Sequence, residues 1–343
     1  MRAVSYSRYG EHPQLVERPA PRCPADGVVV RVEATGVCRS DWHAWRGHDP
    51  VPLPMVPGHE FAGTVHEVGA DVRGWRVGQR VTAPFVQGCG RCSWCAAGEA
   101  QVCPDQQQPG FTRDGSFAEL VVVTAAELNL VALPDAVDPV SAAALGCRVA
   151  TAHRALTVHG RLAAGQWLAV HGAGGVGLSA VMIGRALGAR VLAVDVSAAA
   201  RQRASELGAE VVLEPGERLA EQVREVTGGG AHVSVDAVGA PATVAASVHC
   251  LRPRGRHVQV GLLLGADALP PVPMGPVVAS ELSLHGSHGM AAVDYPALLE
   301  LVTTGALRPA ELVGRVVGLA EAGDVLATLD APQPVPGITV VRL

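Results

Sequence analysis

The stretch Gln166–Asp195 constrains the fold more than any other part of the chain. It begins with the nearly unbroken apolar run Trp167–His171, which predicts a parallel strand covered by helices on both faces. The sequence Gly-Ala-Gly-Gly-Val-Gly follows at residues 172–177 and matches the pattern G-x-G-x-x-G. An apolar helical segment comes next, and a second strand is predicted over Arg190–Val194. Strand, turn, helix and strand in this order predict a dinucleotide-binding unit.

Each glycine of this turn has its own role in such a unit. Gly172 permits the tight turn, Gly174 lets the backbone approach a pyrophosphate, and Gly177 lets the helix pack closely on the strand. The predicted cofactor contacts at the free N–H groups of the helix N-terminus are Gly172, Gly174, Gly175, Val176 and Gly177. Asp195 follows 18 residues after the last glycine, and its carboxylate can accept hydrogen bonds from a ribose 2′-OH. Because it would repel a 2′-phosphate, NAD is predicted in preference to NADP.

Length and composition limit the possible classes of protein. A chain of 343 residues suggests two domains, and 48% hydrophobic with 17% charged residues is typical of a globular protein. The net charge of −5 argues against a nucleic-acid partner. His171, Arg185 and Arg190 interrupt the apolar window, which argues against a membrane span. Met1–Gly10 has no signal-peptide pattern, so a cytoplasmic location is expected.

Eight cysteines in a cytoplasmic chain point to metal ligands or free thiols before disulfides. Cys89, Cys92, Cys95 and Cys103 follow one another at spacings of two, two and seven residues. Four thiolates in such a run predict a closed tetrahedral site, which is typical of structural zinc. An iron–sulfur cluster uses similar spacing and remains the alternative.

A second group of metal-binding residue types lies in two loops of the β-rich first part of the chain. The loops are Cys38–His43 and Gly58–Glu60, and Cys147 stands in a Gly-Cys-Arg turn directly before the nucleotide-binding unit. Cysteine and histidine are good zinc ligands. Taken singly, each of them could equally be a buried thiol or a solvated imidazole.

Together these motifs resemble the zinc-dependent, medium-chain alcohol dehydrogenases over essentially the whole chain. The resemblance rests on Gly58-His59-Glu60, Cys38-x-Ser40-Asp41-x-His43, the four-cysteine run, Cys147 and the glycine turn with Asp195. It implies an α/β protein with a GroES-like β-rich catalytic domain over residues 1–147 and a Rossmann domain, a doubly wound parallel sheet, over residues 148–285. Residues 286–343 would return to the catalytic domain, with the active site in the cleft between the two.

The resemblance also implies a role for each site residue. Cys38, His59 and Cys147 would hold a catalytic zinc ion. Glu60 would approach the metal, Asp41 would orient the ligand histidine, and Ser40 and His43 would form a proton relay. Phe85 and Trp45 would line the substrate pocket, with Trp42 nearby, and plain core packing is the alternative for these aromatic residues.

The alternation of strands and helices after Asp195 predicts a six-stranded parallel sheet, whose strand ends would line the cofactor crevice. Candidate nicotinamide or ribose contacts there are Val238, Gly261, Leu262, Ser287 and His288. The resemblance adds Thr151 as a contact near the nicotinamide. Two positions depart from the family pattern, because Ala200 and Thr339 stand where relatives often carry lysine and arginine, which puts the cofactor affinity in doubt.

The function implied is reversible, NAD-linked oxidation of an alcohol to an aldehyde or ketone, in a homo-oligomer that is a dimer or a tetramer. The partner would be a small alcohol or aldehyde, with two zinc ions per chain. A polyol, amino-alcohol or formaldehyde-conjugate dehydrogenase shares every motif and remains an alternative. A non-catalytic NAD-binding zinc protein is the alternative from another class.

Overall fold

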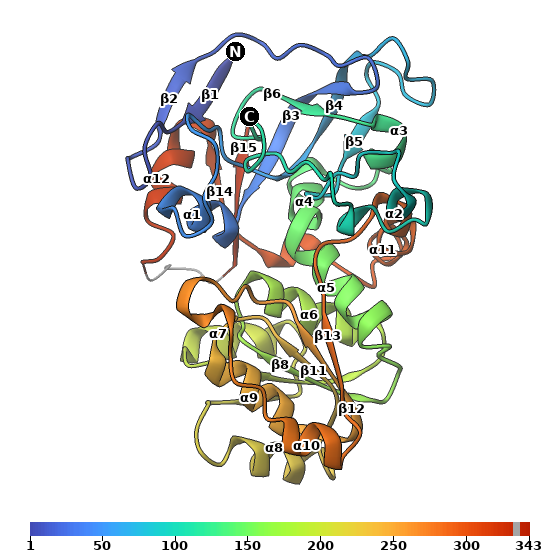
Figure 1. The fold of residues 1–343 in the computed structure, drawn as a ribbon, viewed down its shortest axis with the longest axis vertical. Coiled ribbons are helices and arrows are strands. Elements are labelled where there is room, and N and C mark those ends of the chain that lie inside the picture. Colours follow the sequence, from blue (N-terminus) through green and yellow to red (C-terminus); the bar gives the residue numbers. More distant parts are fainter. Residues whose placement is uncertain (332–336) are drawn as a thin grey trace. The chain divides into compact units, whose positions relative to one another are not determined.

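The computed structural model describes residues 1–331 and 337–343. The chain forms two compact units, one made of Met1–Ala150 with Gly289–Leu343 and the other of Thr151–His288 (Figure 1). Each boundary lies three residues beyond the one expected from sequence, at 147/148 and 285/286. At the first boundary the helical turns of residues 139–159 run on without a break, so no turn residue marks the crossing.

The first unit is built on a mixed sheet with strand order β14-β15-β3-β4-β5-β7, and β6 pairs with β3. The bounds are β3 Val28–Val37, β4 Glu60–Val68, β5 Arg80–Thr82, β6 Leu120–Val123, β7 Val131–Ala132, β14 Val313–Gly318 and β15 Ile338–Arg342. A separate hairpin joins β1 (Arg2–Ser5) to β2 (Gln14–Glu17). The last strand, β15, runs antiparallel to β3, so the C-terminal segment belongs to the first unit.

Short helices connect the strands of the first unit. They are α1 Arg39–Arg46, α2 Ser93–Ala96, α3 Ala126–Asn129, α4 Pro139–Ala144, α11 Tyr295–Thr303 and α12 Ala322–Ala327. Helix α4 begins at Asp138, whose side chain accepts hydrogen bonds from the N–H groups of Val140 and Ser141. After α4 the chain makes a π-helical turn, Leu145–Val149, and continues as α5 (Ala150–Arg154). Every residue of that turn is buried, although it contains an arginine.

The second unit contains a six-stranded parallel sheet with strand order β10-β9-β8-β11-β12-β13. The bounds are β8 Trp167–His171, β9 Arg190–Val194, β10 Val211–Leu213, β11 Ala231–Asp236, β12 Leu251–Gln259 and β13 Ser283–Gly286. The predicted parallel sheet of six strands is therefore confirmed. The order reverses between β8 and β11, and ligands of doubly wound sheets bind at the carboxyl ends of the strands at such a switch point.

One strand of this sheet begins earlier than its sequence suggests. The pattern predicts a strand near His257–Val260, whereas β12 already begins at Leu251. Pro253 and Gly255 look like turn residues in the sequence. They are accommodated because the register between β11 and β12 shifts along this part of the pair.

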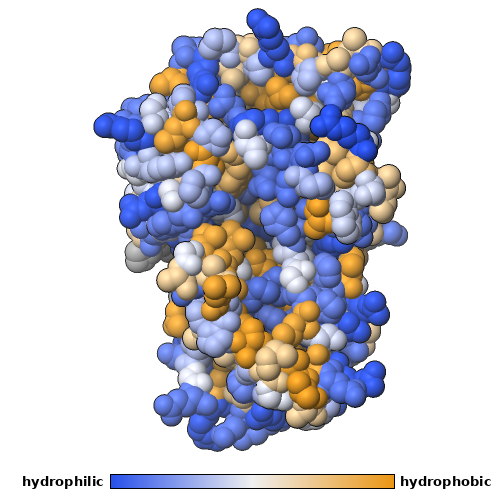
Figure 2. Space-filling model, in the orientation of Figure 1, coloured by the Kyte–Doolittle hydropathy of each residue, from blue (hydrophilic) through white to orange (hydrophobic). Residues whose placement is uncertain are grey.

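Five helices alternate with the strands of the second unit. They are α6 Gly175–Ala186, α7 Ala198–Glu206, α8 Leu219–Thr227, α9 Pro241–His249 and α10 Met274–Ala279. Among the described residues, no helix is both long and apolar enough to cross a membrane. Helix α10 and the segment before it carry four exposed hydrophobic side chains, Leu269, Val272, Met274 and Val278. Figure 2 shows hydrophobic side chains on the surface of this unit.

Candidate metal and nucleotide sites

The structure brings together four residues from three segments that lie far apart in the sequence of the first unit. The metal-binding atoms of Cys38, His59, Glu60 and Cys147 all lie within 4.8 Å of one another, and all four residues are buried. Cys38 follows β3 directly and precedes α1, His59 precedes β4, and Cys147 lies in the π-helical turn. Because β3 and β4 are paired, their adjoining ends place Cys38 and His59 side by side.

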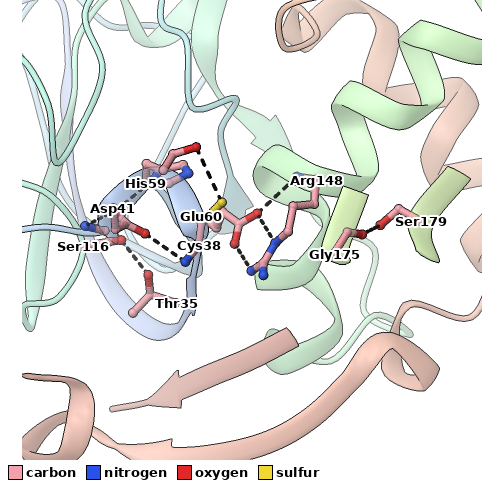
Figure 3. A network of polar contacts seen from close by, with 11 residues as sticks. Thr35, Cys38, Asp41, His59, Glu60, Ser116, Arg148, Gly175 and Ser179 are labelled. Carbon is pink, nitrogen blue, oxygen red and sulfur yellow. Dashed lines mark hydrogen bonds and ion pairs between the residues drawn. The ribbon is translucent and has the colours of Figure 1, made fainter. Parts of the chain in front are cut away.

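Asp41 fixes the arrangement of this cluster. Its Oδ1 accepts hydrogen bonds from His59 Nδ1 at 2.9 Å and from the Gly58 N–H at 3.0 Å. Its Oδ2 accepts a hydrogen bond from the Cys38 N–H at 3.0 Å (Figure 3). In the neutral imidazole, a carboxylate on Nδ1 keeps the proton there and leaves Nε2 as the nitrogen that can bind a metal.

The free nitrogen of His59 is the strongest sign of a missing ligand. His59 Nε2 is fully buried and has no hydrogen-bond partner among the described residues. Buried polar atoms are nearly always paired, so an unpaired one requires an explanation. A nitrogen acceptor that faces two cysteine sulfurs is the donor set of a zinc ion, and three such ligands leave the fourth position open. The residues of the cluster therefore fit a catalytic metal.

The buried groups of the cluster shift the pKa values of its residues in different directions, and the hydrogen bond with Cys38 together with burial raises the pKa of the Cys147 thiol well above its usual range. The hydrogen bond from Cys147 and the charges of Arg148 and His59 hold the pKa of the Cys38 thiol well below its usual range, although burial opposes them. Burial lowers the pKa of His59, but Asp41 and Cys38 outweigh it, so that this pKa lies well above its usual range. These shifts favour the thiolate at Cys38, the form of cysteine that binds metals, whereas a metal would displace the protons that are favoured on His59 and Cys147.

Arg148 is one residue of the site that the sequence analysis missed. Its Nε and its backbone N–H donate to Glu60 Oε1 at 3.0 Å and 3.2 Å, and its Nη2 donates to Glu60 Oε2 (Figure 3). The carboxylate is completely buried and the guanidinium nearly so. Gly36 makes room for the pair, because a Cβ there would overlap both side chains. Glu60 lies among the metal-binding atoms, and Arg148 holds its carboxylate in place.

The two predicted relay residues lie on α1, Ser40 in its first turn and His43 in its last. The Ser40 hydroxyl oxygen is 3.8 Å from Cys38 Sγ. Nδ1 of His43 lies 3.2 Å from Nδ1 of His48, a residue that the sequence analysis did not single out. No hydrogen bond between Ser40 and His43 is present in the described residues, so the relay between them remains a prediction.

The two predicted pocket residues differ in their surroundings. Phe85 packs with Cys38, Val86 and Cys147, and its ring meets the His59 ring edge-on at 5.7 Å. Trp45 lies instead in the core of the first unit, and its Nε1 donates to the Glu11 carbonyl at 2.6 Å. This corrects the pocket prediction for Trp45, since it lies on the buried face of α1 with Asp41 and Ala44. Phe111, which the sequence analysis missed, has its ring 5.2 Å from that of His59.

The four-cysteine run forms a second cluster of metal-binding atoms. The sulfurs of Cys89, Cys92, Cys95 and Cys103 also lie within 4.8 Å of one another. Cys92 Sγ is 3.5 Å from Cys95 Sγ and 3.7 Å from Cys103 Sγ. Backbone N–H groups donate to these sulfurs, and the one of Arg91 contributes most to lowering the pKa of Cys89 to about 7. All eight cysteines lie in the described part of the chain and are free thiols.

The glycines of the turn in the second unit differ in what surrounds them. Gly172 has a φ of +92°, which favours glycine, and its N–H donates to the Val194 carbonyl at 2.8 Å. A Cβ on Gly177 would overlap the Gly172 carbonyl oxygen, so α6 can approach β8 only with glycine there. A Cβ on Gly174, in contrast, would have no described atom within 4 Å. The space beside Gly174 is free for a ligand, as a phosphate cradle requires.

Asp195 lies at the end of β9, next to the glycine turn. Its Oδ2 accepts a hydrogen bond from the Ala173 N–H at 2.7 Å, and its Oδ1 accepts one from the Ser197 N–H at 2.8 Å. The side chain of Arg201 donates to the carbonyl groups of Asp195 and Val196 and pairs with Glu214. Ala200 lies in α7, and Thr339 lies in β15, where it pairs with Val37.

The remaining predicted cofactor contacts follow the strand ends of the second unit. Asp236 at the end of β11 accepts from the N–H groups of Val238 and Gly239 at 2.8 Å and 3.1 Å. Gln259 links Asp236 to the Gly261 carbonyl, which places Gly261 and Leu262 beside this loop. The hydroxyls of Thr151 and Ser287 are buried and have no partner in the described residues. His288 is the last residue of the second unit.

Comparison with known proteins decides the family. Residues 24–135 match the alcohol dehydrogenase GroES-like domain, and residues 175–304 match the zinc-binding dehydrogenase domain. An alcohol dehydrogenase of Geobacillus stearothermophilus is 32% identical over 318 residues, which cover 90% of each protein. The chain belongs to the zinc-binding, medium-chain alcohol dehydrogenase family. It is therefore an oxidoreductase of that family, with the predicted fold of a GroES-like domain and a Rossmann-like parallel sheet.

Solved structures of relatives agree with this assignment. Alcohol dehydrogenase TADH from Thermus sp. ATN1 superposes with a TM-score of 0.91 at 31% identity, and the match covers 100% of this chain and 99% of that one. A zinc-binding dehydrogenase of Sinorhizobium meliloti 1021 that is bound to NADP superposes with a TM-score of 0.87 at 29% identity, with the same coverage. The fold therefore does not decide between NAD and NADP.

Proposed function

We propose that the protein is a zinc-dependent alcohol dehydrogenase that oxidises an alcohol reversibly to an aldehyde or ketone with NAD. The observation that carries the proposal is the buried cluster of Cys38, His59 and Cys147, in which His59 Nε2 has no partner among the described residues. A protein that only binds NAD needs neither this cluster nor the Ser40 hydroxyl beside it. This argues against the non-catalytic alternative.

Zinc, the nicotinamide and the residues of the chain would each supply a different part of the reaction. Bound zinc would supply a Lewis acid that lowers the pKa of an alcohol hydroxyl, and the nicotinamide would accept the hydride. Cys38, His59 and Cys147 would hold the ion, and Asp41 would keep His59 in the tautomer that can bind it. The Ser40 Oγ would take the proton of the alcohol, and His43 would carry it onward. Phe85 would keep water from the reacting atoms.

The second metal would have a structural role. Cys89, Cys92, Cys95 and Cys103 supply four sulfurs and leave no position for a substrate. Membership in a family of zinc-binding dehydrogenases favours zinc over an iron–sulfur cluster here. We therefore expect two zinc ions per chain.

Asp195 supports NAD as the cofactor. Its carboxylate is fixed beside the glycine turn by two backbone N–H groups. The guanidinium of Arg201, which could bind a 2′-phosphate beside Asp195, already binds two carbonyl groups and Glu214. A 2′-phosphate would thus meet a fixed negative charge without a free positive one.

Substitution of Ser40 by alanine tests the proton transfer. We expect turnover to fall by a factor of about 10² to 10⁴, the usual contribution of a positioned proton donor or acceptor. Zinc content, measured by atomic emission, should stay at two ions per chain, because Ser40 is not among the metal-binding residues. Turnover close to that of the unmodified protein would remove Ser40 from the mechanism.

A further inference from the structure

The C-terminal end of α1 places His48 in contact with His43, the second predicted relay residue. Gly47 caps the helix in the left-handed conformation, with a φ of +77°. The chain turns back, so that the N–H of Gly47 donates to the Ala44 carbonyl at 3.0 Å and the N–H of His48 to the His43 carbonyl at 2.9 Å. This cap fixes the backbone of His48 against the turn that carries His43.

The rings of the two histidines are in direct contact. His43 Nδ1 and His48 Nδ1 are 3.2 Å apart, and the ring centroids are 5.5 Å apart. Trp42 meets both rings edge-on, at centroid distances of 5.1 Å and 5.3 Å. Two imidazole nitrogens at this distance share one proton, because one of them must donate and the other accept. His43 is half-buried whereas His48 is exposed, so the contact leads from the protein to solvent.

The surroundings of the pair disfavour the protonated, positively charged form of His43. Burial lowers the pKa of His43, and the charges of His48 and Arg39 lower it further, whereas Cys38 and Asp49 act in the opposite direction. The guanidinium groups of Arg39 and Arg46 lie over the Trp42 ring at 5.0 Å and 5.7 Å from its centroid. A proton that reaches His43 is therefore passed on rather than kept.

We propose that His48 is the group that takes the proton from His43 and delivers it to solvent, so that the relay of this enzyme contains two histidines. This inference rests on the proposed function, because it concerns the proton that the alcohol loses. In the step, His43 gains a proton on Nε2 and gives its Nδ1 proton to Nδ1 of His48. His48 then loses its Nε2 proton to water. One proton enters the pair and one leaves it, and exchange with water restores the starting tautomers.

The test is proton release in the first turnover, followed with a pH indicator in weak buffer after rapid mixing with NAD and an alcohol. In His48→Asn the amide can still bind His43 but cannot pass a proton. We expect proton release at least about ten-fold slower than in the unmodified protein. Concentrated imidazole buffer should restore the rate, because it can replace the missing ring. His66→Asn, which alters another exposed histidine of the first unit, should behave like the unmodified protein.

A second readout does not require activity. In ¹⁵N-histidine NMR of the unmodified protein, the Nδ1 signals of His43 and His48 should show one shared proton, and His48→Asn should change the His43 signal. Proton release at the unmodified rate in weak buffer would overturn the inference, as would a slow rate that no buffer restores. If the unmodified protein oxidises no alcohol, the proposed function fails instead, and the NMR result still decides whether the pair shares a proton.

Discussion

Replacement of Arg148 by methionine is expected to lower the free energy of unfolding by about 3–5 kcal/mol, the range found when one partner of a buried ion pair is removed. The completely buried Glu60 carboxylate would lose both guanidinium hydrogen bonds and keep only the backbone N–H of residue 148. Methionine fills much of the space of arginine, so the effect reports the uncompensated charge more than a cavity. Urea unfolding of the zinc-loaded protein measures it.

Two control variants make this result specific. Arg218 pairs with Glu221 on the surface, where both side chains are exposed, so Arg218→Met should change the stability by less than about 1 kcal/mol. Adding Glu60→Gln to Arg148→Met removes the unpaired charge and should recover part of the loss. A stability of Arg148→Met within about 1 kcal/mol of the unmodified protein would show that Glu60 does not depend on Arg148.

The second large effect concerns Gly177 and Gly174 of the nucleotide turn, because alanine should destabilise the protein at the first and not at the second. Gly177→Ala places a Cβ on the Gly172 carbonyl, so it should lower the free energy of unfolding by about 1–3 kcal/mol, as overpacking does. A Cβ on Gly174 has free space, and Gly174 caps α6 in an extended conformation that alanine can also adopt. Gly174→Ala should therefore change the free energy of unfolding by less than about 0.5 kcal/mol.

Although Gly174→Ala should leave the stability unchanged, it should weaken cofactor binding. If the pyrophosphate uses the space beside Gly174, the alanine variant should bind NADH at least about ten-fold more weakly, a loss of about 1.4 kcal/mol. Titration of NADH fluorescence measures this affinity, and urea unfolding of the same samples measures stability. Unchanged NADH affinity of Gly174→Ala would move the pyrophosphate away from this turn.

Local patterns explain why much of the fold could be predicted. The strand Trp167–His171 is buried at every position, and its continuous apolar run is the pattern that such a strand requires. Gly172 and Gly177 are recognisable because only glycine fits their backbone and packing. The four cysteines also lie close together in the sequence.

Contacts between distant segments could not be predicted in the same way. Arg148 follows a ligand cysteine directly, but its partner Glu60 lies 88 residues earlier, and only the fold brings them together. In the sequence His48 looks like a loop residue, and only the left-handed cap at Gly47 brings its ring into contact with His43. The sequence alone left Trp45 open between pocket and core, because the buried face of α1 is defined by the strands and helices that pack on it.

The most direct test of the central claim is reduction of NAD and, in parallel, NADP by the zinc-loaded protein, followed by absorbance across primary, secondary, aromatic and polyol alcohols. We predict turnover with NAD on one class of alcohol and little or none with NADP. Turnover on polyols or conjugates alone would favour the alternative dehydrogenases on this scaffold. Turnover with NADP alone would contradict the role given to Asp195, and the absence of turnover on every alcohol, from protein that holds two zinc ions, would contradict the proposed function.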